Sequence, residues 1–486
     1  MCRCVVMTQL APTPAESPPE HTRASSGGGW RTNLLLVLAA ILLLAGLVVG
    51  AIYWRIQFER RQAIEDVQAE LDRIAAAGEP ITPEEMHRYH QGGPRSAEKA
   101  RLWLEAIKAL PDFKDGSEEN VALFDGLKSP LQGDVLARAE ALLPKVAEAI
   151  QWAEEAAKID GESRFPIEFE DGMTALTPHV MGLIKLARFF LLRHCVAIAR
   201  GDADQAIESL KMILTIADAL EYEPLLVSQT ARNGTLRMQF REVPHLLDTL
   251  ELTDAQLADL QNRLASIDFQ QSVRRGLLGE RAGAYHAFHY LMEEPDELFD
   301  EKEAGDGTLR RPADFRYYLD ATSQFLAAAQ RPLPEARVQA MRVETSIKEI
   351  QKSGSRWKKR ELAGSILLLE AAIGSFNFWA NCESDRDSAV AAIAFRRYQL
   401  AHGKPPESLA ALCPEFLTSV PQDPFAESPT PLRMVVADDR FAIYSVGENG
   451  SDDRSLLEDP KSTDDSGIVV CLSLPPKPNS TKSPQE

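Results

Sequence analysis

The sequence predicts a mainly α-helical protein with one N-terminal transmembrane helix, an irregular α-helical body and a small C-terminal α+β module that contains an antiparallel sheet. An uncharged apolar run fills residues 34–54, apolar residues recur every three or four positions up to about residue 402, and short Val- and Ile-rich runs follow near the C-terminus. The predicted segments are a disordered tail (1–32), a transmembrane helix (33–55), a helical domain (56–384), the α+β module (385–474) and a second disordered tail (475–486).

The overall charge argues against a nucleic-acid partner. The chain has 486 residues, with 72 acidic and 53 basic side chains and a formal net charge of -19. Nucleic-acid binding depends on clustered Lys and Arg, and no basic stretch with interleaved aromatic residues is apparent. The length allows two or three domains and a sizeable core.

The apolar run "LLLVLAAILLLAGLVVGAIYW", residues 34–54, predicts a helix that spans a lipid bilayer. A helix rises about 1.5 Å per residue, so such a run crosses the roughly 30 Å hydrocarbon core. A secretory signal is the alternative, but its apolar region is shorter, about 7–15 residues, and ends in small residues. This run ends in Tyr53 and Trp54, followed by Arg55. We therefore expect a permanent single-pass anchor.

Charge bias does not decide the orientation of this anchor. Arg23 and Arg31 precede the run, whereas Arg55, Arg60 and Arg61 follow it. The tail before the run is rich in Pro and Gly and too poor in apolar residues to fold. Translation could begin at Met1 or at Met7, and a start at Met7 would remove Cys2 and Cys4.

The four remaining cysteines do not have the spacing of a zinc site. They lie at positions 195, 382, 413 and 471, and no CxxC pair occurs among them. Cys413 and Cys471 could form a disulfide in an oxidising compartment, or could both be small buried hydrophobic residues.

The clearest unit of the helical body is a hairpin at residues 179–220. Leu183, Leu186 and Phe190 lie on one apolar stripe, Gly201 and Asp202 mark a helix stop and start, and a second stripe follows from Ala206. The turn "ARGDADQAIESL" is similar to those of tetratricopeptide-type repeats. No second copy occurs at a spacing near 34 residues, so an irregular helical domain is favoured over a repeat array that binds peptides.

One group in the body has the residue types of a metal site. In "AYHAFHYLMEE", His286, His289 and Glu293 would share one face of an α-helix, and imidazole and carboxylate groups bind transition metals. A single helix supplies only part of a coordination shell, so a polar face is the alternative. His87 and His90 have the same spacing, in the setting of a solvated helix end. No nucleophile or phosphate-binding motif occurs.

Two adjacent charged residues lie within an apolar helical stretch, "LLGERAGAY". Glu280 and Arg281 could form a buried ion pair with a structural role.

The composition changes after Cys382. A helix that carries Ala391, Phe395 and Tyr398 on one face ends at Gly403, and five prolines then prevent long elements until residue 424. The runs "LRMVV" (432–436) and "FAIYSV" (441–446) predict a hairpin joined by "ADDR", and "IVVCLSL" (468–474) predicts a last strand. An acid-rich stretch separates the last two runs.

The order of these C-terminal elements resembles a known family. Tyr398, Gly403, "ESLAAL", "PEFLTSVPQDPF", a hairpin, "YSVGENG", an acidic loop and a closing strand look like the C-terminal region of the major pseudopilins of type II secretion. The whole chain is also similar to membrane-anchored proteins of planctomycete type, a resemblance that implies no particular activity. The pseudopilin resemblance covers about 80 residues, 398 to 474, and implies a small antiparallel sheet packed on a helix.

The pseudopilin resemblance also implies a calcium ion (Ca²⁺) in the loop before the last strand. Calcium takes six to eight oxygen ligands. Carried onto this chain, the ligands are the carbonyl of Val446 and the side chains of Asn449, Asp452, Asp453, Asp464 and Asp465. Asp452 and Asp453 replace a usual glycine pair, and "RSLLEDPKST" lengthens the loop. A solvated acidic loop without an ion is the alternative.

The start of the apolar run departs from the pseudopilin pattern. Gly29 is followed by "WRTNL", with Leu34 where the processing site of a pseudopilin has Glu. We therefore expect a permanent anchor in the inner (cytoplasmic) membrane rather than processing and polymerisation, with the bulk of the chain on the periplasmic side, as the resemblance implies.

The sequence favours a non-catalytic envelope protein that acts through protein interactions. Its expected partners are the lipid bilayer and envelope or secretion proteins, and no nucleic acid. The alternatives are an enzyme with an unrecognised, metal-dependent site in the helical domain, with His286, His289 and Glu293 as its first candidates, and a helical-repeat protein that binds peptides.

Overall fold

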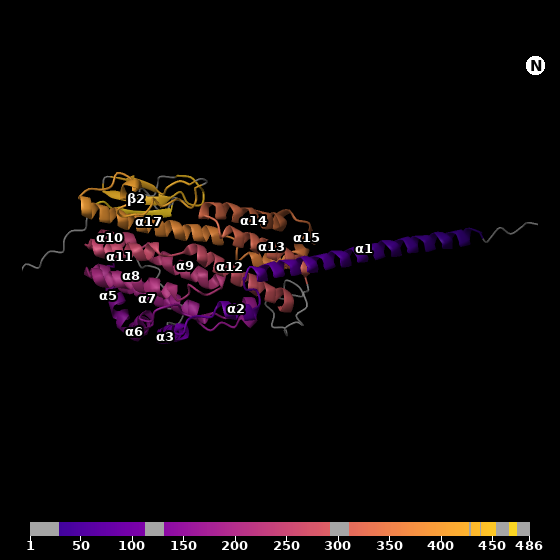
Figure 1. The fold of residues 1–486 in the computed structure, drawn as a ribbon, viewed down its shortest axis with the longest axis horizontal. Coiled ribbons are helices and arrows are strands. Elements are labelled where there is room, and N and C mark those ends of the chain that lie inside the picture. Colours follow the sequence, from indigo (N-terminus) through magenta and orange to yellow (C-terminus); the bar gives the residue numbers. More distant parts are fainter. Residues whose placement is uncertain are drawn as a thin grey trace, which may run out of the picture. The chain divides into compact units, whose positions relative to one another are not determined.

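The computed structural model describes residues 29–111, 131–291, 311–426, 429–437, 439–452 and 466–473. Within these ranges the chain is mostly helical, with one small antiparallel sheet, as the sequence predicts (Figure 1). It divides into two compact units, residues 1–62 and 63–486.

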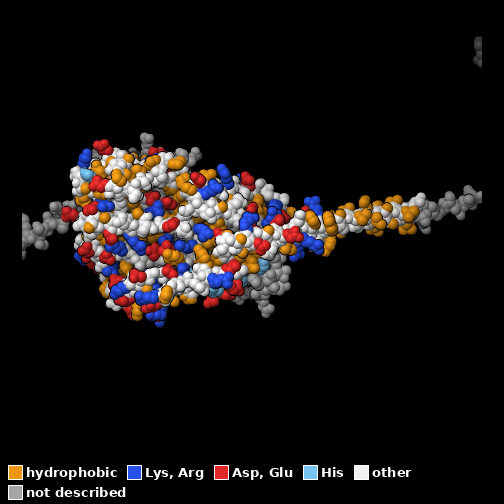
Figure 2. Space-filling model, in the orientation of Figure 1, with side chains coloured by type: hydrophobic (Ala, Val, Ile, Leu, Met, Phe, Trp, Pro, Cys, Tyr) orange, Lys and Arg blue, Asp and Glu red, His pale blue; other side chains and the backbone are white. Residues whose placement is uncertain are grey.

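The first unit contains most of the long N-terminal helix α1, Gly29–Ala76. Its apolar side chains from Leu34 to Phe58 are exposed, and Figure 2 shows them as a continuous apolar surface along this helix. Among the described residues, this is the one helix long and apolar enough to cross a membrane. The pattern changes at residue 63, where the helix enters the second unit and buries Ala63, Val67 and Ile74 along one stripe.

The second unit is built mostly of helices. After α1, these helices are α2 Pro83–Tyr89, α3 Ser96–Lys108, α5 Gly133–Leu142, α6 Ala147–Ala157, α7 Pro178–Arg200, α8 Ala203–Asp218, α9 Leu226–Phe240, α10 Val243–Thr249, α11 Asp254–Ala265, α12 Phe269–His286, α13 Pro312–Ala328, α14 Leu333–Ser353, α15 Arg356–Glu361, α16 Ala363–Leu369 and α17 Ser375–His402. The short 3₁₀ segments are η1 Leu143–Val146, η2 Phe169–Thr174 and η5 Leu409–Leu412, and η3 Ala287–Leu291 is a π-turn.

Helices α7 and α8 form the hairpin that the sequence predicts. Gly201 ends α7 in the left-handed conformation (φ 73°), which glycine adopts without the strain of a side chain. The Asp202 carboxylate then accepts a hydrogen bond of 3.0 Å from the backbone N–H of Gln205 and caps α8. Leu186 and Phe190 of α7 are fully buried, so the predicted apolar stripe faces the core.

Helix α17 is the central helix of the second unit. It packs on α9, α11, α12 and α14 of the body and also on the sheet. Every residue from Ser388 to Arg396 is buried, and the alanines within this stretch allow neighbouring elements to approach closely. Residue 385, where the sequence predicts the start of the C-terminal module, lies inside this helix.

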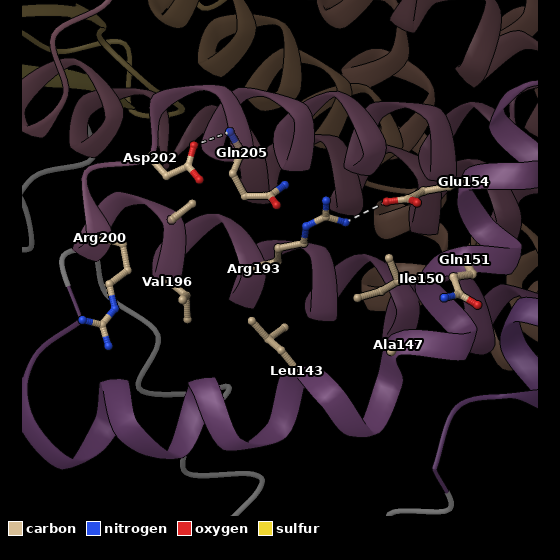
Figure 3. Close-up of a pocket in the computed structure, with 11 residues that line it drawn as sticks. Leu143, Ala147, Ile150, Gln151, Glu154, Arg193, Val196, Arg200, Asp202 and Gln205 are labelled. Carbon is tan, nitrogen blue, oxygen red and sulfur yellow. Dashed lines mark hydrogen bonds and ion pairs between the residues drawn. The ribbon is translucent and has the colours of Figure 1, made fainter.

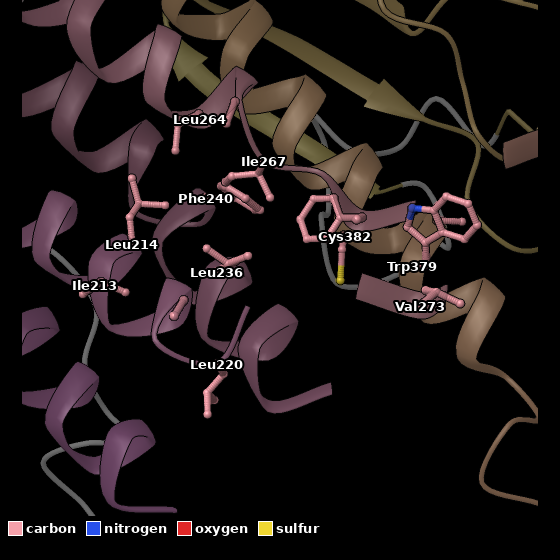
Figure 4. Close-up of a cluster of buried hydrophobic side chains, with 14 of the residues drawn as sticks. Ile213, Leu214, Leu220, Leu236, Phe240, Leu264, Ile267, Val273, Trp379 and Cys382 are labelled. Atoms are coloured by element: carbon pink, nitrogen blue, oxygen red, sulfur yellow. The ribbon is translucent and has the colours of Figure 1, made fainter. Parts of the chain in front are cut away.

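One large apolar cluster joins the helical body to the sheet. Figure 4 shows part of it, with Leu236 and Phe240 of α9 beside Leu264 of α11 and Trp379 and Cys382 of α17. The same cluster continues into the sheet through Phe441 and Ile443. The two predicted regions therefore share one core.

The sheet has three antiparallel strands in the order β1-β2-β3. They are β1 Arg433–Val436, β2 Arg440–Ser445 and β3 Ser466–Cys471. The central strand β2 is buried from Phe441 onward, and the ring of Phe441 stacks on that of Phe395 with centroids 3.7 Å apart. Cys413 and Cys471 are free thiols, so the expected alternative of a disulfide between them is not formed.

Candidate functional site

The predicted calcium loop begins at the end of β2, and half of its candidate ligands are described. Val446 is buried and its N–H donates to Asp423, while the side-chain oxygen of Asn449 accepts from the backbone N–H of Ser451 at 2.8 Å. Asp452 accepts from Arg433 at 3.3 Å and from the Tyr444 hydroxyl at 3.1 Å. Asp453, Asp464 and Asp465 lie outside the described residues.

A buried carboxylate, Asp423, holds the start of this loop in place. Its Oδ1 accepts from the Ser445 hydroxyl (2.6 Å) and the Phe425 N–H (2.9 Å), and its Oδ2 accepts from the Val446 N–H (3.1 Å) and Arg433 Nη1 (2.7 Å). Asp423 is 0% exposed. Arg433 links this carboxylate to Asp452, so one guanidinium connects the buried and the exposed parts of the module.

The predicted histidine group lies at the end of α12. His289 belongs to the π-turn η3, and its Nδ1 is 2.8 Å from the carbonyl of Tyr285. A π-turn rotates residues at i and i+3 further apart than an α-turn does, so the two imidazoles share a face less closely than an α-helix would allow. Burial lowers the pKa of both His286 and His289. Glu293 lies outside the described residues.

His87 and His90 have different surroundings. His87 lies 3.0 Å from Glu170 on the surface, whereas His90 is buried, with Nε2 3.0 Å from the carbonyl of Phe165. Within the part of the chain that the structure describes, no three His, Cys, Asp or Glu side chains are grouped closely enough to hold a metal ion.

The expected ion pair between Glu280 and Arg281 is wrong. Arg281 is buried and contacts Glu79, near the end of α1, at 2.9 Å. Neighbouring residues of a helix point in directions about 100° apart, so Glu280 turns away and accepts a hydrogen bond from the backbone of Leu226. Burial raises the pKa of the Glu280 carboxyl to about 7.

Sequence reasoning missed a polar centre around the connection between α8 and α9, residues 219–225. The Gln229 amide donates to the carbonyls of Leu220 (2.8 Å) and Glu223 (2.7 Å), and its oxygen accepts from the Ser272 hydroxyl (2.6 Å). Two guanidinium groups, of Arg164 and Arg275, lie over the ring of Tyr222 at 4.7 and 4.6 Å. These contacts fix the connection tightly.

A buried histidine and carboxylate belong to the same centre. His179 Nε2 is 2.6 Å from Glu223 Oε1, and the two side chains are 4% and 0% exposed. The His179 ring stacks on Phe165 at 4.3 Å. A histidine beside a carboxylate can act as a general base, but this pair is enclosed by packed side chains, so it supports the connection. The sequence feature that could have indicated this polar centre is a group of polar residues at helical spacing in α9, namely Gln229, Arg232 and Asn233.

A surface groove lies where α6 and η1 face the α7–α8 hairpin (Figure 3). Its volume is about 460 Å³. Apolar side chains form its floor, and charged or amide side chains surround them. The lining residues are Leu143, Ala147, Ile150, Gln151, Glu154, Arg193, Val196, Ala197, Arg200, Asp202 and Gln205.

The polar rim of the groove is ordered by an ion pair between the two facing helices. Arg193 of α7 contacts Glu154 of α6 at 2.9 Å, and Arg200 contacts Glu140 of α5. Ile150 and Val196 are half-buried and pack on a second apolar cluster that includes Phe189 and Cys195. An apolar floor inside a charged rim can accept an apolar side chain of a partner and orient its charged neighbours.

Comparison of this chain with protein-family models, curated proteins and solved structures gives no match.

Proposed function

We propose that this chain is a single-pass protein of the inner membrane that acts by binding other envelope proteins, with its large second unit on the periplasmic side. The observation that supports the anchor is α1, whose most apolar window has a mean hydropathy of 3.0 and no buried residue. Exposed apolar surface of this extent is unstable in water and is stabilised by a hydrocarbon core. The orientation rests on the pseudopilin resemblance.

The groove beside the α7–α8 hairpin supports binding of a protein segment. Paired helices that face a third helix form concave surfaces, which helical-repeat proteins use to bind peptides. The groove holds only a few side chains, so its ligand is a short segment with an apolar residue next to charged residues. An enzyme with a metal site at His286, His289 and Glu293 remains the alternative.

Exchanging the charges of the groove is expected to abolish partner binding without unfolding the chain. The double variant Glu154→Arg/Arg193→Glu keeps an ion pair but reverses the rim charges, and mismatched charges cost several kcal/mol at an interface. The measurement is in-cell photo-crosslinking of the full-length protein from the exposed position 151, followed by mass spectrometry of the captured proteins.

A matched exchange on the same helix is the control. Glu155 of α6 and Lys158, which caps the end of this helix, also form an ion pair but do not line the groove, so Glu155→Lys/Lys158→Glu should leave the captured proteins unchanged. Capture that survives the groove exchange would contradict the proposal. Truncation at residue 385 would be unsuitable, because it removes most of the central helix α17.

We also propose that calcium stabilises the C-terminal module. A ligand that binds only the folded state raises the melting temperature, so millimolar calcium should raise that of the full-length protein in detergent by on the order of a few degrees. The double variant Asp464→Asn/Asp465→Asn should lose this rise, and magnesium should not reproduce it. An equal melting temperature in calcium and in chelator would contradict the site.

A further inference from the structure

The short helix α15 carries an unusual surface for this acidic chain. Trp357 is 76% exposed, and no residue of α15 is buried. Residues 351–361 contain five basic side chains (352, 356, 358, 359 and 360) and one acidic side chain, Glu361, so their net charge is 5 − 1 = +4 in a chain of net charge -19. An exposed tryptophan among basic side chains is typical of segments at a membrane surface.

The backbone of α15 is nevertheless held firmly. Ser355 caps its first turn by accepting a hydrogen bond of 3.2 Å from the backbone N–H of Lys358. At its other end, Arg311 donates to the carbonyls of Arg360 (2.5 Å) and Glu361 (3.1 Å). The backbone of α15 is therefore held in place next to the first residues of α13.

The same end of α13 receives the chain as it leaves the predicted span. Arg316 of α13 contacts Asp66 of α1 at 3.0 Å, and Ser323 donates to Glu70 at 2.9 Å. Arg311 and Arg316 are five residues apart, which corresponds to about 8 Å along the axis of an α-helix. Asp66 is twelve residues after Trp54, so even a fully extended chain keeps it within about 43 Å of the end of the apolar run.

We infer that α15 docks on the surface of the membrane that α1 spans and binds anionic lipid headgroups. Trp357 would lie at the interface, while Arg356 faces the phosphates together with Lys358, which would exchange its ion pair with Glu361 (3.0 Å) for a lipid phosphate. The tether keeps α15 close to the bilayer, so weak contacts suffice. Charge complementarity favours an anionic lipid surface over an apolar protein surface. The inference rests on the proposed membrane anchoring by α1.

The fluorescence of Trp357 itself tests this inference. The full-length protein and its Trp357→Phe variant are reconstituted in phosphatidylcholine vesicles with and without phosphatidylglycerol. The difference between their emission spectra isolates Trp357, because the other tryptophans cancel. With phosphatidylglycerol we expect this difference spectrum to shift to shorter wavelength and to be quenched by brominated lipids. We expect Arg356→Gln and Lys358→Gln each to lower the ratio of docked to undocked α15 by on the order of fivefold.

Three outcomes would overturn the inference. The first is a Trp357 emission spectrum that does not change with lipid composition. The second is quenching by brominated lipids that is equal with and without phosphatidylglycerol. The third is a spectral shift that occurs only when another protein is added. The same subtraction with Trp152→Phe, which reports a half-buried tryptophan of α6, should show no response. An alkaline wash of the vesicles separates the two proposals: loss of the protein contradicts the anchor and the inference together, whereas retained protein with an unresponsive Trp357 contradicts the inference alone.

Discussion

Replacing Asp423 with alanine is expected to destabilise the C-terminal sheet by about 3 kcal/mol, because it removes a fully buried carboxylate from its hydrogen-bonded ion pair with the partly exposed Arg433. The substitution leaves the buried N–H groups of Phe425 and Val446 without an acceptor, at about 1–3 kcal/mol each. Hydrogen exchange should show the loss first in the amides of β2, which ends beside Asp423. Thermal unfolding of the full-length protein gives the total effect.

The isosteric variant Asp423→Asn is the sharper test. Each carboxylate oxygen of Asp423 accepts from two donors, so an amide nitrogen in either position would face two donors instead of accepting from them. We therefore expect Asn to be nearly as harmful as Ala. Asp452→Asn is the control, because this carboxylate binds the same Arg433 but is 31% exposed, and such pairs contribute about 0–1 kcal/mol. Equal stability of the two Asn variants would contradict the role of Asp423.

Features that depend on a few neighbouring residues were predictable from the sequence. The long apolar helix, the α7–α8 hairpin and the three strands are all present, the strands within a few residues of the predicted runs. Each is specified locally, by an uncharged run, by Gly201 and Asp202 at a turn, or by residues with high strand propensity.

The surroundings of α17 were not predictable in the same way. Its periodicity predicts one apolar face, on which Ala391 and Phe395 lie, yet the helix is buried on nearly all sides from Ser388 to Arg396. Small residues such as Ala389 and Ala392 are neutral in a periodicity argument, and only the assembled neighbours show that they are core positions. A single buried helix therefore serves both the body and the sheet.

The buried polar contacts join residues far apart in the sequence, so local sequence patterns did not predict them. Arg281 contacts the carboxylate of Glu79, which follows α1, and Gln229 of α9 contacts Ser272 of α12. Asp423 contacts Arg433 and Ser445 because the chain around residue 423 packs beside the sheet. Local sequence indicates that such side chains are unusual in their setting, but the partner is set by tertiary packing.

Glu280 is expected to make the stability of the protein fall as the pH rises. Its Oε2 is buried and, among the described residues, has no hydrogen-bond partner; burial raises the pKa of this carboxyl from 4.5 to about 7. Below pH 4.5 the group is protonated in both the folded and the unfolded chain, so its full stabilisation is present. Between pH 4.5 and 7 the unfolded chain releases the proton first, and about 3 kcal/mol of unfolding free energy is lost.

The variant Glu280→Gln should remove this dependence. At pH 4, where the carboxyl is protonated in the folded chain and mostly so in the unfolded chain, the amide and the carboxyl are nearly equivalent, and the two proteins should unfold at similar urea concentrations. At pH 8 the wild type must bury a charge, and the variant should be more stable by about 2–3 kcal/mol. The same substitution at the exposed Glu251 should have no such effect. Parallel pH profiles for the wild type and Glu280→Gln, measured in detergent micelles, would show that the carboxylate of Glu280 is hydrated in the folded protein.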